Sequence, residues 1–306
     1  MTRRRRLDVI GAPSSAAAYS PGQERAPGAI RAAGLLSALR DRGIDVKDRG
    51  DVPGFRWSVD RTNPRAMNAD AAARVARAVA DQVADGLGAG AAMLVLGGDC
   101  TIELGTVAGA SVDTESVGLI YVDLDTDLNT PVSVEDGALD WMGVAHLLNL
   151  DDTMPVLAGV GRRMPMLRPD QIAYFATDNV TPFERRVIEE RGIKEVRLAE
   201  VVADPAVAAR GLLAEWARRF DRLLVHVDVD VLDYLDLPLA EEHRRNRGLR
   251  FTQLVAALRE FVTASNWVAL TISEVNPDHG EADGSTMRTL CEGLADVLSG
   301  AAGIGA

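Results

Sequence analysis

Residues 117–131 read VGLIYVDLDTDLNTP, an apolar run followed directly by three aspartates at alternate positions. A short run that is apolar at every position is typical of a buried strand in a parallel sheet, because helices cover both faces of such a strand. The aspartates at its end, Asp123, Asp125 and Asp127, fall where α/β proteins bind ligands, beyond the carboxyl ends of the strands. The segment therefore predicts both a fold class and a place for chemistry.

Similar apolar runs recur along the chain and alternate with helical patterns. We expect strands at Leu7–Gly11, Ala92–Gly97, Val117–Asp123, Gln171–Phe175, Glu195–Leu198, Arg222–Asp228 and Trp267–Val275. We expect helices at Ala26–Arg42, Asn68–Gly86, Thr101–Ala110, Trp141–Asn149, Pro182–Arg191, Pro205–Phe220, Phe251–Thr263 and Ala282–Leu298. This alternation predicts an α/β fold with three α/β/α layers and a mainly parallel, doubly wound sheet. Since no linker or repeat divides the chain, we expect one domain over residues 1–306, with a basic tail at 1–6.

Composition limits the classes of function. The 306 residues include 33 Lys and Arg against 45 Asp and Glu, a formal net charge of −12. Such an acid excess argues against nucleic acid or an anionic membrane as a partner, because phosphate groups bind to basic surfaces. No apolar stretch reaches the ~18 residues that indicate a membrane span. The two cysteines cannot form a disulfide framework and suit a reducing compartment, so we expect a cytoplasmic protein.

Acidic residues follow two of the predicted strands. Residues 225–233 read VHVDVDVLD and place Asp228 and Asp230 at the end of a second strand, as Asp123, Asp125 and Asp127 end the first. Residues two apart on an extended segment share a face, so each set can converge. Buried carboxylates repel one another unless cations neutralise them, and bridging carboxylates suit a pair of metal ions. One such motif alone is commonly a turn or a solvated edge, but two sets after two strands favour a metal site.

The sequence resembles the ureohydrolase family, which includes arginase and agmatinase, over nearly its whole length. Residues 21–35, PGQERAPGAIRAAGL, are similar to the arginase segment before its first long helix, and residues 45–52, DVKDRGDV, to the strand that follows. VDLDTDLNTP at 122–131 resembles the family's VDAHTDINTP, and the DVD at 228–230 and the EVNP at 274–277 match family motifs. The order and spacing of these motifs agree with the family's.

The resemblance implies a hydrolase in which two Mn²⁺ ions hold a bridging hydroxide that attacks a guanidinium carbon and releases urea. The metals lower the pKa of the bound water and so supply a nucleophile at neutral pH. By resemblance, Asp123 and Asp228 would bridge the metals, while Asp127 and Asp230 would each complete one metal's ligands. Glu274 would hold the planar guanidinium, which pairs well with a carboxylate. The resemblance also implies a small guanidino substrate and a homo-oligomer, a trimer or a hexamer.

Three family histidines are absent. The first metal histidine is Cys100 here, the second is Asp125, and the histidine that shuttles protons aligns with Asp140. In one interpretation the site is retuned, with Cys100 and Asp125 as ligands of Mn, Fe or Zn and Asp140 as the proton carrier. In the other, the chain is a catalytically inactive, metal-poor or metal-free homologue with a regulatory or scaffolding role. We favour the first, because drift commonly leaves Ala, Ser or Gly where this chain has competent ligands.

Other residue types near these motifs have alternative roles. His226 shares a face with Asp228, so it either orients that carboxylate or is a hydrogen-bonded residue deeper in the sheet, which is the simpler interpretation. His146 lies inside a predicted helix and is expected to be structural, while His279 belongs either to an ordinary loop or to the pocket mouth. A nucleophilic Cys100 has no support from a local base in the sequence.

The resemblance also bears on the substrate. Arginase reads the amino-acid end of its substrate with an Asn, a Ser and an Asp; here Asn129 keeps the first, Asp136 replaces the second, and Thr181 aligns with the third. A carboxylate at position 136 would repel a substrate carboxylate, so we expect a guanidino compound without one, such as a guanidino-amine, rather than L-arginine. The family's Gly-Thr-Pro loop is missing, and the charged run LPLAEEHRRNRG at 237–248 stands in its place as an expected solvated loop.

Overall fold

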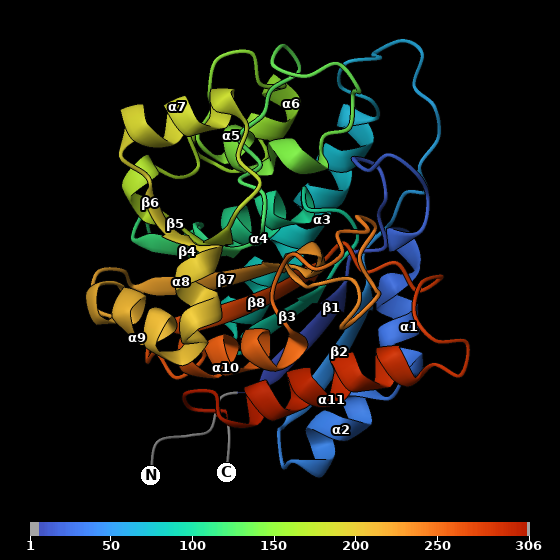
Figure 1. The fold of residues 1–306 in the computed structure, drawn as a ribbon, viewed down its shortest axis with the longest axis vertical. Helices are drawn as coiled ribbons and strands as arrows, with labels where there is room; N and C mark the ends of the chain where they lie inside the picture. Colours follow the sequence, from blue (N-terminus) through green and yellow to red (C-terminus); the bar gives the residue numbers. More distant parts are fainter. Residues whose placement is uncertain (1–5, 305–306) are drawn as a thin grey trace.

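A single parallel sheet organises the chain in a computed structural model that describes residues 6–304, so most of the basic tail expected at 1–6 lies outside the described residues. The sheet has 8 strands in the order β2–β1–β3–β8–β7–β4–β5–β6 (Figure 1). The strands are β1 Leu7–Gly11, β2 Val46–Asp51, β3 Ala92–Leu96, β4 Val117–Val122, β5 Ile172–Thr177, β6 Lys194–Arg197, β7 Arg222–Asp228 and β8 Trp267–Ser273. Every pairing between neighbouring strands is parallel.

Helices fill the connections between the strands. The α-helices are α1 Ala26–Ala32, α2 Leu35–Asp41, α3 Ala69–Gly88, α4 Ile102–Ala110, α5 Gly143–Leu147, α6 Pro155–Ala158, α7 Pro182–Arg191, α8 Leu198–Ala203, α9 Pro205–Trp216, α10 Phe251–Phe261 and α11 Ser285–Ser299. Short 3₁₀ turns are η1 Gln23–Arg25, η2 Asp140–Met142, η3 Pro169–Gln171 and η4 Val229–Val231. Among the described residues, no helix is both long and apolar enough to cross a bilayer.

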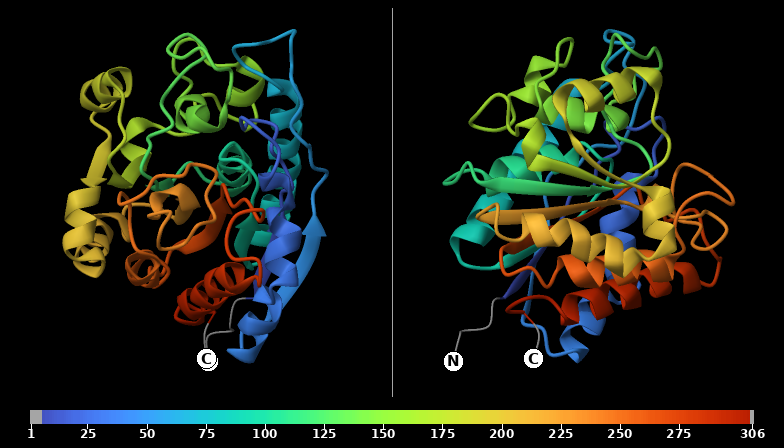
Figure 2. Two further views of the ribbon diagram at one scale, coloured as in Figure 1. Left: turned by 45° about the vertical axis from the view of Figure 1, so that its right-hand side comes forward. Right: turned by 60° about the vertical axis from the view of Figure 1, so that its left-hand side comes forward.

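The predicted fold class is confirmed, because the parallel sheet carries helices on both faces. Figures 1 and 2 show α3 and α4 on one side and α9, α10 and α11 on the other. Successive side chains of a strand point to opposite faces, and in β3 the side chain of Val95 joins the core under α3 and α4, while Leu94 and Leu96 join the core under α10 and α11. Burying each such side chain contributes about 1.5–3 kcal/mol, so the two cores hold the three layers together.

Some elements differ from the sequence expectation. The helix expected at Ala26–Arg42 is two helices, α1 and α2, and Gly34 between them has a φ of 99°. That left-handed conformation suits glycine, which has no Cβ to clash. The strand β2, indicated by the resemblance and not by hydropathy, lies at the sheet edge with half-buried and exposed residues. The short helices α6 and α8 were not expected, because four to six residues are too few to show a helical period.

The strand order brings together segments that are far apart in the sequence. The four central strands β3, β8, β7 and β4 lie side by side and run in the same direction. Their carboxyl ends therefore meet at one edge of the sheet, which is where α/β proteins place ligand sites. Each of these four ends carries one of the acidic or thiol residues singled out in the sequence.

Candidate functional site

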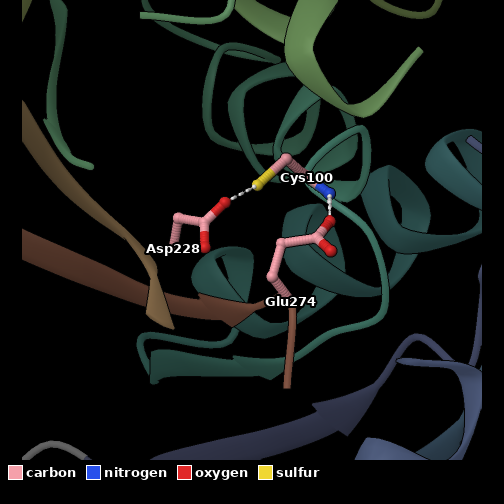
Figure 3. A group of neighbouring side chains, drawn as sticks. All are labelled: Cys100, Asp228 and Glu274. Carbon is pink, nitrogen blue, oxygen red and sulfur yellow. Dashed lines mark hydrogen bonds between the residues drawn. The ribbon is translucent and has the colours of Figure 1, made fainter. Parts of the chain in front are cut away.

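A thiol and two carboxylates meet at the ends of β3, β7 and β8 (Figure 3). Cys100 lies in the turn between β3 and α4, and its Sγ donates a hydrogen bond to Asp228 Oδ2 at 2.9 Å. The backbone N–H of Cys100 donates to Glu274 Oε1, also at 2.9 Å. The Sγ and one oxygen of each carboxylate all lie within 4.8 Å of one another, a spacing compatible with a bound metal ion.

A second group consists of Asp123, Asp125 and Asp230, and one oxygen of each lies within 4.8 Å of the others. Two turn hydrogen bonds orient the carboxylates: the N–H of Asp125 donates to Asp123 Oδ1 and the N–H of Asp230 to Asp228 Oδ1, both at 2.8 Å. Among the described residues, Asp123 Oδ2 and Asp230 Oδ1 are buried oxygens without a hydrogen-bond partner. Buried carboxyl oxygens in this state are either neutralised by a proton or offset by a bound cation, because an unpaired buried charge is costly.

Asp127 belongs to neither group. The strand β4 ends at Val122, and Asp127 has a φ of 50°, so the alternation that would place it beside Asp123 and Asp125 does not continue. Its Oδ2 accepts a hydrogen bond from the buried Tyr121 hydroxyl. The prediction of three converging aspartates assumed an extended segment, and the turn after β4 removes that geometry, although Asp127 still lines the same pocket.

The electrostatics of the site favour a bound cation. Burial, followed by repulsion from Asp228 and Asp230, raises the pKa of Asp123 well above its usual range. Burial and Asp140 raise the pKa of Glu274 in the same way, and burial and Asp228 raise the pKa of the Cys100 thiol. A divalent cation would reverse these shifts by favouring the ionised ligands. The donor set of carboxylate oxygens and one sulfur therefore fits a metal ion such as Mn, Fe or Zn.

An arginine lies against the second group. Arg244 Nη1 is 2.7 Å from Asp125 Oδ2 and 3.5 Å from Asp230 Oδ2, and the side chain is only 17% exposed. Burial alone would lower the pKa of Arg244, but Asp230 and Asp125 raise it above its usual value. The charged run at 237–248 was expected to be solvated; residues 242, 243 and 245–247 are exposed, but the structure turns the Arg244 side chain inward.

His226 is fully buried in β7 and contacts the thiol. Its Nε2 lies 3.4 Å from Cys100 Sγ, its Nδ1 lies 3.3 Å from Glu103 Oε2, and its ring stacks on Tyr121 with centroids 4.2 Å apart. This arrangement agrees with the simpler interpretation of a hydrogen-bonded histidine inside the sheet. The side chain that His226 contacts is Cys100, whereas the alternative raised from the sequence was that His226 orients the Asp228 carboxylate.

A pocket opens above both groups. Its described lining residues include eight carboxylates, among them Asp140, Asp228 and Glu274, and one guanidinium, that of Arg244. Tyr19 and Trp141 form its apolar wall, with ring centroids 6.2 Å apart. Such a lining suits a small cationic molecule, because a guanidinium or ammonium group finds hydrogen-bond acceptors of opposite charge there.

Comparison with known proteins places this architecture in a family. A model of the arginase family matches residues 5–299. The chain belongs to the arginase family. It is 30% identical to human arginase-1 over 298 residues, covering 96% of this chain and 92% of that protein. Its structure is similar to that of the arginase from Bacillus caldovelox with a TM-score of 0.86, 26% identity, and coverage of 96% of this chain and 98% of that one.

A further match extends the likeness of fold only. The proclavaminate amidino hydrolase from Streptomyces clavuligerus superimposes with a TM-score of 0.73 at 18% identity, covering 97% of this chain and 92% of that one. Proteins with different names therefore share this fold. The fold alone does not identify a substrate.

The three expected substrate-binding residues of this arginase-family chain lie outside the pocket lining. Asn129 Oδ1 accepts a hydrogen bond from Ser133 Oγ at 3.1 Å. Asp136 is exposed and accepts a hydrogen bond from the Tyr19 hydroxyl at 3.2 Å. Thr181 is the N-cap of α7, where its hydroxyl accepts from the N–H of Glu184. Asp136 therefore contacts the pocket wall through Tyr19. Capping the N-terminus of α7 accounts for the threonine at position 181 without a role in substrate binding.

Sequence reasoning missed several site residues of this arginase-family chain, among them Arg244, Tyr19 and Gln23. Arg244 gave no signal beyond its place in a charge run, and Tyr19 gave none at all. Gln23 Nε2 donates to Glu274 Oε2 at 3.1 Å and so holds the side of Glu274 that faces away from Cys100. Gln23 lies in the PGQERAPG stretch that resembles arginase, and that stretch is the signal that points to it.

Proposed function

We propose that this chain is a metal-dependent amidinohydrolase that hydrolyses a C–N bond of a small guanidino compound and releases urea. The observation that carries the proposal is the pocket itself, in which Glu274, Asp140 and carboxyl groups from both metal-ligand groups line one space. Membership of the arginase family supports the same reaction class.

Each residue in the pocket has a role that its contacts support. Glu274 is held by the N–H of Cys100 and by Gln23, which leaves carboxylate lone pairs for a substrate guanidinium. Asp140 lines the same pocket, and burial and Asp99 raise its pKa well above the usual range, so it can hold a proton for the leaving amine. Cys100, Asp123, Asp125, Asp127, Asp228 and Asp230 are the proposed ligands, and a bound metal would lower the pKa of a water molecule.

The proposed substrate is a guanidino-amine. The lining carries eight carboxyl groups, and those that are ionised would attract a second positive charge at the far end of a substrate and repel a carboxylate there. L-arginine presents a carboxylate at that end. The accumulated acidity of the pocket therefore favours a guanidino-alkylamine over an amino acid.

A panel assay tests this proposal. Urea release is measured from a guanidino-alkylamine, L-arginine and a guanidino acid, with Mn²⁺, Fe²⁺ or Zn²⁺ added to the protein. We expect the guanidino-alkylamine to be preferred and Glu274→Gln to lose at least ~10²-fold in kcat/KM, since the amide cannot pair with the guanidinium charge. The exposed Glu190→Gln on α7 is the matched control. Loss of activity in both variants, or in neither, contradicts the proposed role of Glu274.

One observation favours a second candidate function. Arg244 forms ion pairs with Asp125 and Asp230, two of the proposed ligands, which is what a decayed, non-catalytic homologue would also show. In that case the chain would bind less than about a tenth of an equivalent of metal under gentle purification, and added metal would produce no urea. Metal analysis and the panel assay together separate the two functions.

The family resemblance also supports proposals about domain organisation, location and oligomeric state. We propose one domain over residues 1–306, since the single sheet spans the described chain, and a cytoplasmic homo-oligomer, a trimer or a hexamer. Gel filtration with light scattering measures the oligomer directly.

A further inference from the structure

Arg244 has a place in the site that deepens the proposed function, on which this inference rests. We propose that the guanidinium of Arg244 takes the position of one of the two metal ions, so that the centre holds a single divalent cation beside Cys100 and Asp228. The chain would then be a one-metal member of a family whose site is expected to hold two.

The contacts of Arg244 carry the first step. Its Nη1 lies 2.7 Å from Asp125 Oδ2 and 3.5 Å from Asp230 Oδ2. Asp123, Asp125 and Asp230 are the residues whose oxygens converge within 4.8 Å, so they form the cradle that a second ion would use. A guanidinium and a divalent ion would compete for the same lone pairs and repel each other at contact distance, so the cradle accepts one or the other.

The carboxylate at position 125 is a better ion-pair partner for the Arg244 guanidinium than a histidine would be. A histidine ring offers a guanidinium one neutral acceptor nitrogen, whereas the carboxylate of Asp125 offers a full opposite charge and more lone pairs. Asn179 Nδ2 donates to the other oxygen of Asp125 at 2.5 Å, which holds the carboxylate toward Arg244. The Asp at 125 and the Arg at 244 are therefore complementary.

The loop that carries Arg244 is anchored on both sides. The N–H of Tyr234 donates to the Arg244 carbonyl at 2.9 Å, and Leu232 and Leu249 form a bridge at the base of the loop. Asp233 Oδ1 accepts hydrogen bonds from the N–H groups of Leu235 and Asn246, both at 3.0 Å. Because the loop backbone is already ordered, placing the guanidinium beside the cradle costs only the conformational entropy of the Arg244 side chain.

The other group stays available to a metal ion. Cys100 Sγ and oxygens of Asp228 and Glu274 lie within 4.8 Å of one another, and Arg244 makes no ion pair with any of them. Asp123 Oδ2 is buried without a partner among the described residues. The single charge of Arg244 does not neutralise the carboxylates around it, and a divalent cation on the Cys100 side supplies the remaining charge.

Metal stoichiometry tests the inference without relying on activity. Wild type, Arg244→Gln, Arg244→Lys and the control Arg245→Gln are loaded with Mn²⁺, passed through a desalting column and analysed for manganese per chain. Arg245 is an exposed neighbour without an ion pair or side-chain hydrogen bond among the described residues, and its substitution by Gln removes the same single positive charge from the loop. Electron paramagnetic resonance distinguishes an isolated Mn²⁺ from a spin-coupled pair.

We expect about one Mn²⁺ per chain in wild type, Arg244→Lys and Arg245→Gln, and about two, with a spin-coupled signal, in Arg244→Gln. Two Mn²⁺ in wild type together with urea release overturns the inference while leaving the proposed function intact. The same stoichiometry in wild type and Arg244→Gln also overturns it. A wild type that binds no metal overturns the inference, and failure of the proposed function is then read separately from the panel assay.

Discussion

At the scale of single residues, Asp123 shows most directly how the site opposes ionisation of its own carboxyl groups. It is fully buried, its Oδ2 has no partner among the described residues, and neighbouring carboxylates repel it. Two nearby residues, Asp127 and Glu274, have φ values of 50° and 62°, which cost of order 1–3 kcal/mol each in a side-chain-bearing residue. Strain and repulsion at one place are typical of a site whose residues serve a ligand.

We predict that Asp123→Asn stabilises the metal-free chain by about 1–2 kcal/mol, because the amide is neutral without having to take up a proton and still accepts the hydrogen bond from the N–H of Asp125. The same variant should weaken metal binding, since one of the proposed carboxylate ligands has become neutral. Urea unfolding with and without Mn²⁺ measures both effects. Asp81→Asn on the exposed face of α3 is the control, and a destabilised Asp123→Asn chain would contradict the predicted repulsion.

His146 gives a pH dependence that is separate from the metal site. It is fully buried in α5; its Nδ1 lies 2.6 Å from the Met142 carbonyl oxygen, and its Nε2 accepts a hydrogen bond from the N–H of Met154 at 3.1 Å. Burial lowers the pKa of His146 to about 4. The neutral ring is therefore the form that the fold requires, and the unfolded chain binds a proton at a higher pH than the folded chain does.

Stability should consequently fall as the pH falls through the window between about 6.5, the unfolded pKa, and about 4. From about pH 7.5 to about pH 5 the loss due to His146 is roughly 2 kcal/mol. A His146→Gln variant should lack this part of the pH dependence, because an amide does not titrate. Urea unfolding of both chains at the two pH values measures it; parallel pH profiles would show that His146 does not titrate as described.

At the scale of elements, the connection between α1 and α2 decides where the first helical segment turns. Gly34 has a φ of 99°, and a Cβ added there would meet no atom within 4 Å. Gly28 lies inside α1 and also has open space around it, but its φ is not in the left-handed region. Neither glycine is crowded, so a comparison of alanine substitutions at the two positions isolates the effect of the left-handed φ of Gly34.

We predict that Gly34→Ala destabilises the chain by about 1 kcal/mol, because a Cβ is disfavoured in the left-handed conformation. Gly28→Ala should stabilise it by about 0.5–1 kcal/mol, since alanine loses less entropy in a helix. The free energy of unfolding in urea gives both values. Equal effects of the same sign would mean that the break between α1 and α2 does not depend on Gly34.

At the scale of the whole molecule, four strands and two cores converge on one acidic edge. β3, β4, β7 and β8 each deliver part of the site, so the folded chain holds together carboxylates that the unfolded chain would keep apart. Burial of the two cores must offset the free-energy cost of bringing these carboxylates together, and a bound cation would lower that cost.

We therefore predict that a chelator lowers the unfolding temperature and that Mn²⁺ restores it, with a gain of about 2.7 kcal/mol at a metal concentration one hundred times Kd. Asp228→Asn should show no such gain, because it removes a ligand of the proposed ion. Differential scanning calorimetry of both chains, with and without Mn²⁺, measures the effect. A shift of the same size in Asp228→Asn would mean that the metal binds elsewhere.

Much of this architecture could be predicted from the sequence because its signals are local. Apolar runs such as Val117–Val122 and Arg222–Asp228 mark strands by their own composition, and Pro182 after Thr181 marks the start of α7. The expectation that acidic residues at the strand ends form a site came from the general rule that parallel sheets bind ligands beyond the carboxyl ends of their strands. The break at Gly34 could not be predicted, because a single glycine inside a helical period is also tolerated without a break.

The sequence by itself determined the parallel α/β fold, the strand ends that carry the acids, and the replacement of family histidines by Cys100, Asp125 and Asp140. Only the tertiary structure decided how those residues divide into groups, because strand order and the turn after β4 set which oxygens converge and turn Asp127 toward Tyr121. The same holds for Arg244, whose inward position depends on a loop folded back over the sheet edge. Hydrophobic periodicity is a property of neighbouring residues, whereas an ion pair between distant segments exists only once the sheet has brought them together.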